Sequence, residues 1–193
     1  MKITQLTEDL IKFTGSDLVN VYLVISKKLI IDAGNPVDKI ELKKGIDSAI
    51  GCDNIKHIIL THFHYDHAGN IGLFPNARVY ASKEEIKGLA DFGLMLTFNK
   101  SVLSELSNRK ILDIKKYKDK SFEYIETPGH TPGGLSIIYK DKGGKKYLFS
   151  GDVMFRNGIG RTDFPSSIPG KMEKSLKILS ETIFDILLPG HDY

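Results

Sequence analysis

The sequence predicts an α/β protein in which two mixed β-sheets are sandwiched between helices. Short strand-like segments open the chain, helices and strands then alternate, and this succession occurs twice. The chain has 193 residues, of which 41% are hydrophobic, so it is long enough to bury a proper core. We therefore expect a single domain that covers residues 1–193.

The N-terminal strands are expected to form a meander. Apolar and β-branched runs bounded by polar turns predict strands over residues 3–6, 10–14, 19–25 and 29–32. The last of them ends at Asp32, before a turn that contains glycine and proline. An amphipathic helix over residues 37–50 follows, with Ile40, Ile46 and Ile50 among its charges, and it ends at Gly51.

Helices and strands then alternate. Strands are predicted over residues 57–60, 78–81, 111–114, 122–126, 135–139, 145–149 and 185–188, and helices over 66–73, 82–91 and 170–183. Ser82 and Glu85 have the spacing of a capping box at the start of the second of these helices. Residues 92–109 have helix-like apolar spacing, which indicates either a helix packed on the core or a lid or dimer face near the site.

The densest cluster of chemically active side chains follows the strand at residues 57–60. His62, His64, Asp66 and His67 fall within six positions, where the strand runs into a turn and a helix. Imidazole nitrogens and a carboxylate suit Zn²⁺, and also Fe²⁺ or Mn²⁺. A polar loop that uses histidines for turns and caps is the alternative, but it does not need four such residues so close together.

This cluster resembles the signature of the metallo-β-lactamase superfamily. Three later residues match further parts of that pattern: His130 in Thr-Pro-Gly-His-Thr-Pro-Gly, Asp152 in Phe-Ser-Gly-Asp and His191 in Leu-Pro-Gly-His. The resemblance therefore spans residues 32–193. It implies an αββα four-layer sandwich of the metallo-β-lactamase type.

The resemblance also implies a ligand set for two divalent metal ions, with zinc as the first choice and iron or manganese as alternatives. One ion would be held by His62, His64 and His130, and the other by Asp66, His67 and His191, with Asp152 bridging them. The two ions would share a hydroxide that acts as the nucleophile, and Asp66 would additionally orient it. Asp32 would hold a ligand histidine from beneath.

The segments after Asp152 resemble glyoxalase II, a hydrolase of thioesters. Residues 151–155, residues 158–161 and the His191-Asp192-Tyr193 end carry this similarity. The chain has Arg161 and Asp163 where that family has a lysine and an aromatic residue for glutathione, and we expect no C-terminal helical domain. The expected function is therefore metal-dependent hydrolysis of a small-molecule thioester, with the carrier open. Residues 160–164 also resemble mononuclear iron persulfide dioxygenases, and a lactonase or other ester hydrolase is a further alternative.

Two residues are candidates for binding the substrate. Arg161 follows two glycines after Asp152, so its guanidinium could bind a carboxylate of an anionic thiol carrier, and Tyr193 could offer its hydroxyl to the same ligand. The alternative for Arg161 is a surface salt bridge with Asp163.

Composition limits the partners and the location. The net charge is +3, with lysines and glutamates interspersed, which is not the footprint of a nucleic-acid-binding protein. No apolar run approaches the length of a membrane span, the start of the chain lacks the apolar core of a signal peptide, and Cys52 is the single cysteine. We expect a cytoplasmic protein that binds neither nucleic acid nor membrane, with a possible homodimer through residues 92–109.

Overall fold

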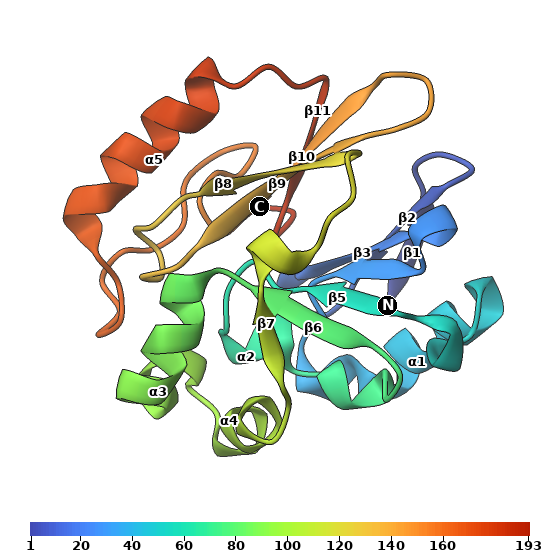
Figure 1. Cartoon of the computed structure of the whole chain (residues 1–193), viewed down its shortest axis with the longest axis horizontal. Coiled ribbons are helices and arrows are strands. Elements are labelled where there is room, and N and C mark those ends of the chain that lie inside the picture. Colours follow the sequence, from blue (N-terminus) through green and yellow to red (C-terminus); the bar gives the residue numbers. More distant parts are fainter.

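Two mixed β-sheets lie face to face, with helices on both outer sides, in a computed structural model that describes residues 1–193 (Figure 1). The larger sheet has the strand order β1 (Lys2–Gln5), β2 (Leu10–Thr14), β3 (Asn20–Val24), β4 (Leu29–Ile31), β5 (His57–Ile59), β6 (Arg78–Ala81) and β7 (Ile111–Asp113). The smaller sheet has the order β11 (Ile186–Pro189), β10 (Lys146–Gly151), β9 (Leu135–Lys140) and β8 (Phe122–Glu126).

Both sheets combine antiparallel and parallel pairs. Strands β1 to β4 form the expected antiparallel meander, whereas β4 to β7 pair in parallel because a crossover separates each strand from the next. In the smaller sheet β8, β9 and β10 are antiparallel and β11 joins β10 in parallel. The two mixed sheets predicted from the sequence are confirmed.

The helices form the two outer layers. They are α1 (Lys39–Ala49), α2 (Tyr65–Ala68), α3 (Lys83–Thr97), α4 (Lys100–Ser107) and α5 (Pro169–Glu181). In Figure 1, α1 to α4 lie beneath the larger sheet and α5 runs along the outer side of the smaller one. The order of layers is therefore helices, sheet, sheet and helix, which confirms the αββα sandwich.

Three apolar clusters correspond to the three contacts between these layers. Residues such as Tyr22 and Ile31 meet Ile137 and Phe149 between the two sheets. A second cluster, which includes Phe13, Leu23, Leu42, Ile46 and Phe63, packs α1 to α4 on the larger sheet. Met172 and Leu179 of α5 pack on Ile138 and Leu148 of the smaller sheet. Each sheet face that is turned away from water therefore has an apolar partner.

Some predicted element limits were wrong. The helix expected over residues 66–73 ends at Ala68 and is followed by a 3₁₀ turn over Ile71–Leu73. The chain turns there because the Asn70 side chain donates hydrogen bonds to the carbonyls of Ala33 and Asn35, at 2.9 and 2.8 Å. Helix α3 continues past residue 91 to Thr97, with a kink at Phe92.

The apolar face of α1 and the end of α5 also differ from the prediction. Ile40 is 69% exposed, because it lies six positions before Ile46 and so points about 120° away from it around α1. Leu42, Gly45 and Ile46 form the buried face instead. Ile183 is 80% exposed because α5 ends at Glu181, before reaching it.

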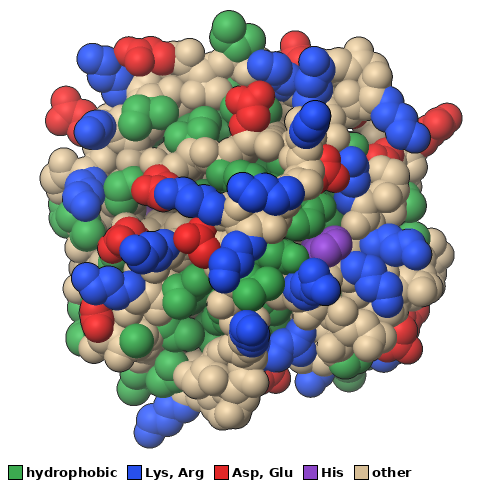
Figure 2. Space-filling view, viewed as in Figure 1, with side chains coloured by type: hydrophobic (Ala, Val, Ile, Leu, Met, Phe, Trp, Pro, Cys, Tyr) green, Lys and Arg blue, Asp and Glu red, His purple; other side chains and the backbone are tan.

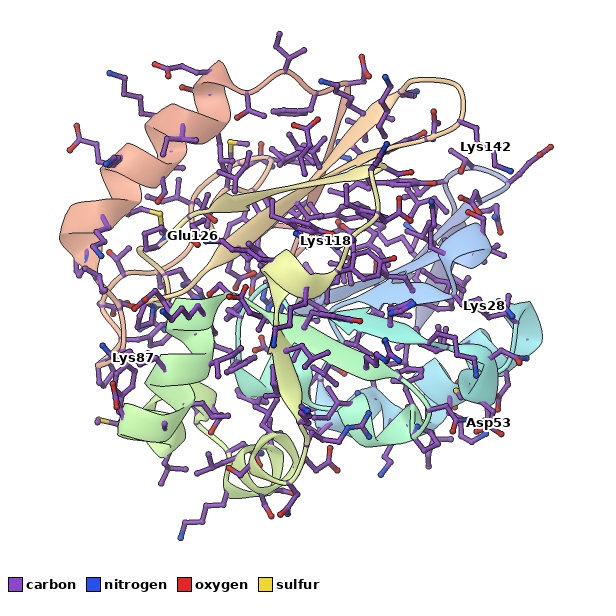
Figure 3. All side chains as sticks on the ribbon, viewed as in Figure 1. Lys28, Asp53, Lys87, Lys118, Glu126 and Lys142 are labelled. Atoms are coloured by element: carbon purple, nitrogen blue, oxygen red, sulfur yellow. The ribbon has the colours of Figure 1, made fainter.

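Charged side chains cover the outside of the sandwich. The labelled residues in Figure 3, such as Lys87 on α3 and Lys142 in the β9–β10 hairpin, are exposed and extend away from the layers. Figure 2 shows basic side chains across this face, with acidic and apolar ones among them. None of the helices has the length and apolar character needed to cross a membrane.

Candidate metal centre

The seven predicted ligand residues converge at one edge of the two sheets. His62 and His64 lie in the loop after β5, and Asp66 and His67 lie in α2, which that loop enters. His130 lies in the loop between β8 and β9, Asp152 directly follows β10, and His191 follows β11. Because β10 and β11 are parallel, their carboxyl ends meet at the same edge.

Three of the histidines form a first cluster. The possible ligand atoms of His62, His64 and His130 all lie within 4.8 Å of one another, and all three residues are buried. The closest pair is Nδ1 of His64 and Nε2 of His130, 3.0 Å apart. Three imidazole nitrogens that face a common point are a usual set of ligands for zinc or iron.

Asp66, His67 and His191 form a second cluster, which meets the same 4.8 Å limit. The Nε2 atoms of His67 and His191 are 3.3 Å apart, and Nε2 of His191 is 3.5 Å from Oδ2 of Asp66.

Asp152 lies between the two clusters. Its Oδ2 is 3.4 Å from Nε2 of His130 in the first cluster and 3.2 Å from Nε2 of His191 in the second. Its Oδ1 is 3.3 Å from Nε2 of His67, so one carboxylate faces ligand atoms on both sides.

Hydrogen bonds at one ring nitrogen of each histidine determine whether the other ring nitrogen is free to bind a metal. Nδ1 of His130 is 2.7 Å from the carbonyl oxygen of Arg161, and Nδ1 of His191 is 2.8 Å from that of Asp17. A carbonyl oxygen only accepts hydrogen bonds, so each Nδ1 carries the proton and each Nε2 presents a lone pair to the centre. Nδ1 of His67 likewise donates to Asp32, at 2.9 Å.

This arrangement fits a bound cation. When both imidazoles are neutral, the lone pairs on Nε2 of His67 and His191 face each other at 3.3 Å and gain no hydrogen bond, so the pair needs a positive charge, from a proton or from a metal ion. Nε2 of His62 and Oδ1 of Asp152 are buried and have no hydrogen-bond partner. Buried acceptors of this kind are costly unless something coordinates them, and a divalent cation would satisfy all of these atoms at once.

The pKa values differ between the clusters. Burial and the neighbouring His67 and His64 hold the pKa of His62 well below its ordinary value. Burial also lowers the pKa of His67, but the carboxylates of Asp152, Asp66 and Asp32 outweigh it and hold that pKa well above its ordinary value. The second cluster therefore carries the acidic side chains that favour a positive charge, whether from a proton or a metal ion.

Asp32 lies beneath this arrangement and bonds to a histidine of the second cluster. Its carboxylate accepts hydrogen bonds from the backbone N–H and the hydroxyl of Thr61, at 2.7 and 2.8 Å, in addition to the bond from His67. The residue adopts a left-handed backbone conformation with φ of 60°. Aspartate, like glycine and asparagine, tolerates this conformation better than most other residues do. Asp32 thus joins the end of β5 to a histidine of the second cluster.

Gly190 allows the close approach of β11 to the centre. A Cβ at this position would lie 2.2 Å from Oδ1 of Asp152 and 2.8 Å from the His67 ring. The Leu-Pro-Gly-His motif therefore needs its glycine for space beside the cluster.

Glu85 is a residue of the site whose position the sequence did not reveal. Its carboxylate is fully buried and accepts hydrogen bonds from the backbone N–H of Phe63, at 2.9 Å, from that of Gly133, at 2.9 Å, and from the hydroxyl of Thr131, at 3.0 Å. Phe63 lies between His62 and His64, and Thr131 follows His130. One side chain of α3 therefore ties together the two loops that carry the first cluster.

The expected capping box is only half formed for the same reason. The Ser82 hydroxyl accepts a hydrogen bond from the Glu85 backbone N–H at 3.1 Å. The Glu85 carboxylate, however, bonds to the two loops that carry the first cluster instead of to the Ser82 backbone. Nothing in the Ser-x-x-Glu spacing distinguishes these two outcomes.

Both candidate substrate residues lie on a cavity of about 630 Å³ that opens from the clusters. Tyr193 is 54% exposed at its edge. The guanidinium of Arg161 donates two hydrogen bonds to Asp163, at 2.9 and 2.8 Å, which is the salt bridge that the sequence left as the alternative. Phe98, Phe155 and Phe164 also line the cavity, and the sequence assigned them no role.

Phe98 is the part of residues 92–109 that reaches the site. Leu96 of α3 and Val102 and Leu106 of α4 are buried in the core, as expected for helices packed on it, while Phe98 faces the cavity.

An αββα sandwich with histidine and aspartate clusters at the carboxyl edge of its sheets is the architecture of one class of metal-dependent hydrolases. The sequence profile of the metallo-beta-lactamase superfamily matches residues 14–191. The chain therefore belongs to the metallo-β-lactamase superfamily.

Its relatives include two probable metallo-hydrolases of Methanocaldococcus jannaschii. One is 35% identical over 147 residues, which cover 72% of this chain and 58% of that protein. The other is 32% identical over 191 residues, which cover 89% of this chain and 86% of that protein. The hydroxyacylglutathione hydrolase GloC of Haemophilus influenzae is 32% identical over 153 residues, which cover 72% of this chain and 69% of that protein.

Among solved structures, TTHA1623 in a di-iron-bound form is similar, with a TM-score of 0.68 and 26% identity over 94% of this chain and 92% of that one. These comparisons agree with a metal-dependent hydrolase that can hold divalent metal ions.

Proposed function

We propose that this protein hydrolyses a small-molecule thioester at a centre of two divalent metal ions. The observation that carries the proposal is the pair of three-residue clusters with the Asp152 carboxylate between them, beside an open cavity. The first ion would be held by His62, His64 and His130, and the second by Asp66, His67 and His191. Zinc is the metal we propose first, with iron or manganese as alternatives.

Two bound cations would lower the pKa of a shared water towards neutrality and polarise the carbonyl of the substrate. The chain supplies the other elements of the reaction. Asp66 lines the cavity, and its Oδ2 is 3.5 Å from Nε2 of His191 and 4.0 Å from Nε2 of His67. We propose that its carboxylate orients the attacking water towards the carbonyl carbon.

A thioester suits the residues of this cavity. The lining holds no lysine or cysteine, and both of its tyrosines, Tyr65 and Tyr193, have pKa values raised by burial and by nearby carboxylates such as Asp66. A thiol leaving group with a pKa of about 8.5 departs as a thiolate and needs no proton donor, unlike an alkoxide or an amine. The 32% identity to a hydroxyacylglutathione hydrolase supports the same reaction class.

The test is to prepare the protein loaded with zinc, iron or manganese and to assay each form with thioesters, with a lactone and with a persulfide. We expect thioester hydrolysis that is lost on chelation and restored by metal. Oxygen consumption with the persulfide, without thioester turnover, would establish the dioxygenase reaction instead. Faster turnover of the lactone would establish an ester hydrolase.

The cytoplasmic location, the absence of nucleic-acid partners and the homodimer through residues 92–109 stay predictions. Size-exclusion chromatography with light scattering tests the homodimer, because Leu94 and Met95 expose apolar side chains on α3 that a partner would cover.

A further inference from the structure

The cavity beside the metal centre has two aromatic walls. Phe98 and Phe164 form the first wall, with ring centroids 5.1 Å apart, and both rings contact the His64 ring, at 5.1 and 5.4 Å. Phe155 and Tyr193 form the second wall, with centroids 5.3 Å apart, and Tyr193 stacks on His191 at 4.8 Å. Each wall therefore flanks one of the two ligand clusters.

Much of this apolar surface is open to water. Phe98 is 41% exposed, Ile159 is 53% exposed and Tyr193 is 54% exposed, and all three lie on the same cavity. Single exposed apolar side chains are common on protein surfaces, but a concave group of them next to a reactive centre is the usual form of a ligand-binding site. A ligand with an apolar group would remove this surface from water and gain binding free energy in proportion to the area covered.

The one basic side chain on the cavity wall is already paired with a carboxylate. Arg161 is the only lysine or arginine that lines the cavity. Both of its hydrogen-bonding contacts go to the Asp163 carboxylate, and its guanidinium carbon lies 4.3 Å from the centroid of the Phe164 ring. Arg161 therefore extends the first wall by stacking on Phe164, and the neighbouring Asp163 carboxylate balances its charge.

We propose that the substrate of this protein is an uncharged thioester that carries an apolar group, an aromatic ring or branched alkyl chain, bound between the two aromatic walls. A thioester of an anionic carrier such as glutathione would bring its carboxylates next to Asp163, which already balances the Arg161 guanidinium and repels a further negative charge. This inference rests on the proposed thioester hydrolysis, and it replaces the expectation that Arg161 binds a carboxylate.

Binding is tested with thioethers, which the protein cannot hydrolyse, by isothermal titration calorimetry on the metal-loaded protein. S-benzyl-N-acetylcysteamine is neutral with an apolar ring, S-methyl-N-acetylcysteamine lacks the ring, and S-benzylglutathione adds the anionic carrier. We expect the neutral benzyl compound to bind at least about tenfold more tightly than either of the others. The methyl compound lacks the ring that covers both walls, and the glutathione conjugate brings carboxylates that find no free partner in the cavity. Equal binding of the benzyl and methyl compounds, or tighter binding of the glutathione conjugate, would overturn the inference.

Single substitutions identify the side chains that bind the apolar group of the ligand. Phe98→Ala should weaken binding of the neutral benzyl compound about tenfold and leave the methyl compound unchanged, whereas Leu94→Ala, an exposed apolar residue of α3 that does not line the cavity, should change neither. Asp163→Ala should free Arg161 and strengthen binding of S-benzylglutathione several-fold. If Arg161→Ala weakened binding of the glutathione conjugate to the otherwise unchanged protein, Arg161 would be the carrier's anchor and the inference would be wrong.

A hydrolysis assay separates this inference from the proposed function. Phenylacetyl thioesters of N-acetylcysteamine and of glutathione are compared by kcat/KM. Turnover of both with preference for glutathione contradicts only the inference. Turnover of neither by the metal-loaded protein contradicts the proposed function, while the thioether titrations still decide whether the cavity selects neutral apolar ligands.

Discussion

Oε1 of Glu85 accepts a hydrogen bond from the backbone N–H of Phe63 at 2.9 Å, deep beneath the first ligand cluster. The other oxygen of the same carboxylate accepts hydrogen bonds from Thr131 and Gly133. Two loops that are about seventy residues apart in the sequence, and that carry His62, His64 and His130, are therefore held by one side chain.

Glu85→Ala should destabilise the protein and weaken metal binding together. The substitution leaves three buried donors without an acceptor, which should lower the free energy of unfolding by about 3 kcal/mol or more. Urea denaturation and competition with a metal chelator measure the two effects. Glu84→Ala is the matched control, because Glu84 lies in the same helical turn but is exposed. Metal affinity as in the wild type would show that the loops keep their places without Glu85.

The pH dependence of stability should carry the signature of Glu85. Burial raises the pKa of Glu85 from 4.5 to about 7, because desolvation outweighs the hydrogen bonds from Phe63, Thr131 and Gly133. A folded-state pKa above the unfolded one gives stability that is fully present below pH 4.5 and lost as the pH rises through about 7. Metal-free wild type should therefore lose roughly 3 kcal/mol relative to Glu85→Gln over this window.

The comparison with Glu85→Gln removes the titration of the ligand histidines, which is common to both proteins. Denaturation curves at a series of pH values measure the difference. A constant difference between pH 4.5 and 7 would mean that the three donors keep the Glu85 carboxylate ionised throughout.

Asp32→Asn should affect the second metal ion more than the first. The amide has one acceptor oxygen where the carboxylate serves Thr61 and His67 with two, so the His67 ring loses its fixed orientation. Loss of such a contact typically lowers metal affinity by 10–100-fold. Stepwise chelator titration should show one weakened site and one unchanged site. Equal weakening of both would contradict the proposal that His67 holds the second ion.

Asp66→Ala should lower thioester hydrolysis by more than about a hundredfold, because it removes both a ligand of the second ion and the group that orients the water. Initial-rate measurements on the metal-loaded variant test this. Asp53→Ala serves as the control, since Asp53, which is labelled in Figure 3, is an exposed acidic residue that does not line the cavity. Thioester turnover within tenfold of wild type would mean that Asp66 has neither role.

The convergence of the candidate ligand residues could be predicted from the sequence because each lies in a short motif at the end of a strand. His62, His130, Asp152 and His191 follow apolar segments and stand beside glycines or other ligand residues, so local patterns and family resemblance place them together. The order of the elements agrees with two sheets between helices, since apolar sheet faces need helices or another sheet to cover them, whereas the four-layer arrangement came from the family resemblance.

Features that depend on packing between distant segments could not be predicted. Glu85 has the spacing of a helix cap, and only the approach of two remote loops diverts its carboxylate. The cavity wall takes Phe98 from the loop between α3 and α4, and Phe155 and Phe164 from the long loop between β10 and α5. The helix predicted over residues 66–73 stops early because Asn70 bonds to the carbonyls of another loop.

The central claim is that the two clusters hold two metal ions, and metal stoichiometry tests it most directly. The purified protein is reconstituted with zinc, freed of excess metal and measured by inductively coupled plasma mass spectrometry, beside His191→Ala prepared in the same way. We predict two ions per chain for the wild type and about one for His191→Ala, because His191 contributes only to the second cluster. A single ion per wild-type chain, or equal contents in both proteins, would contradict the account.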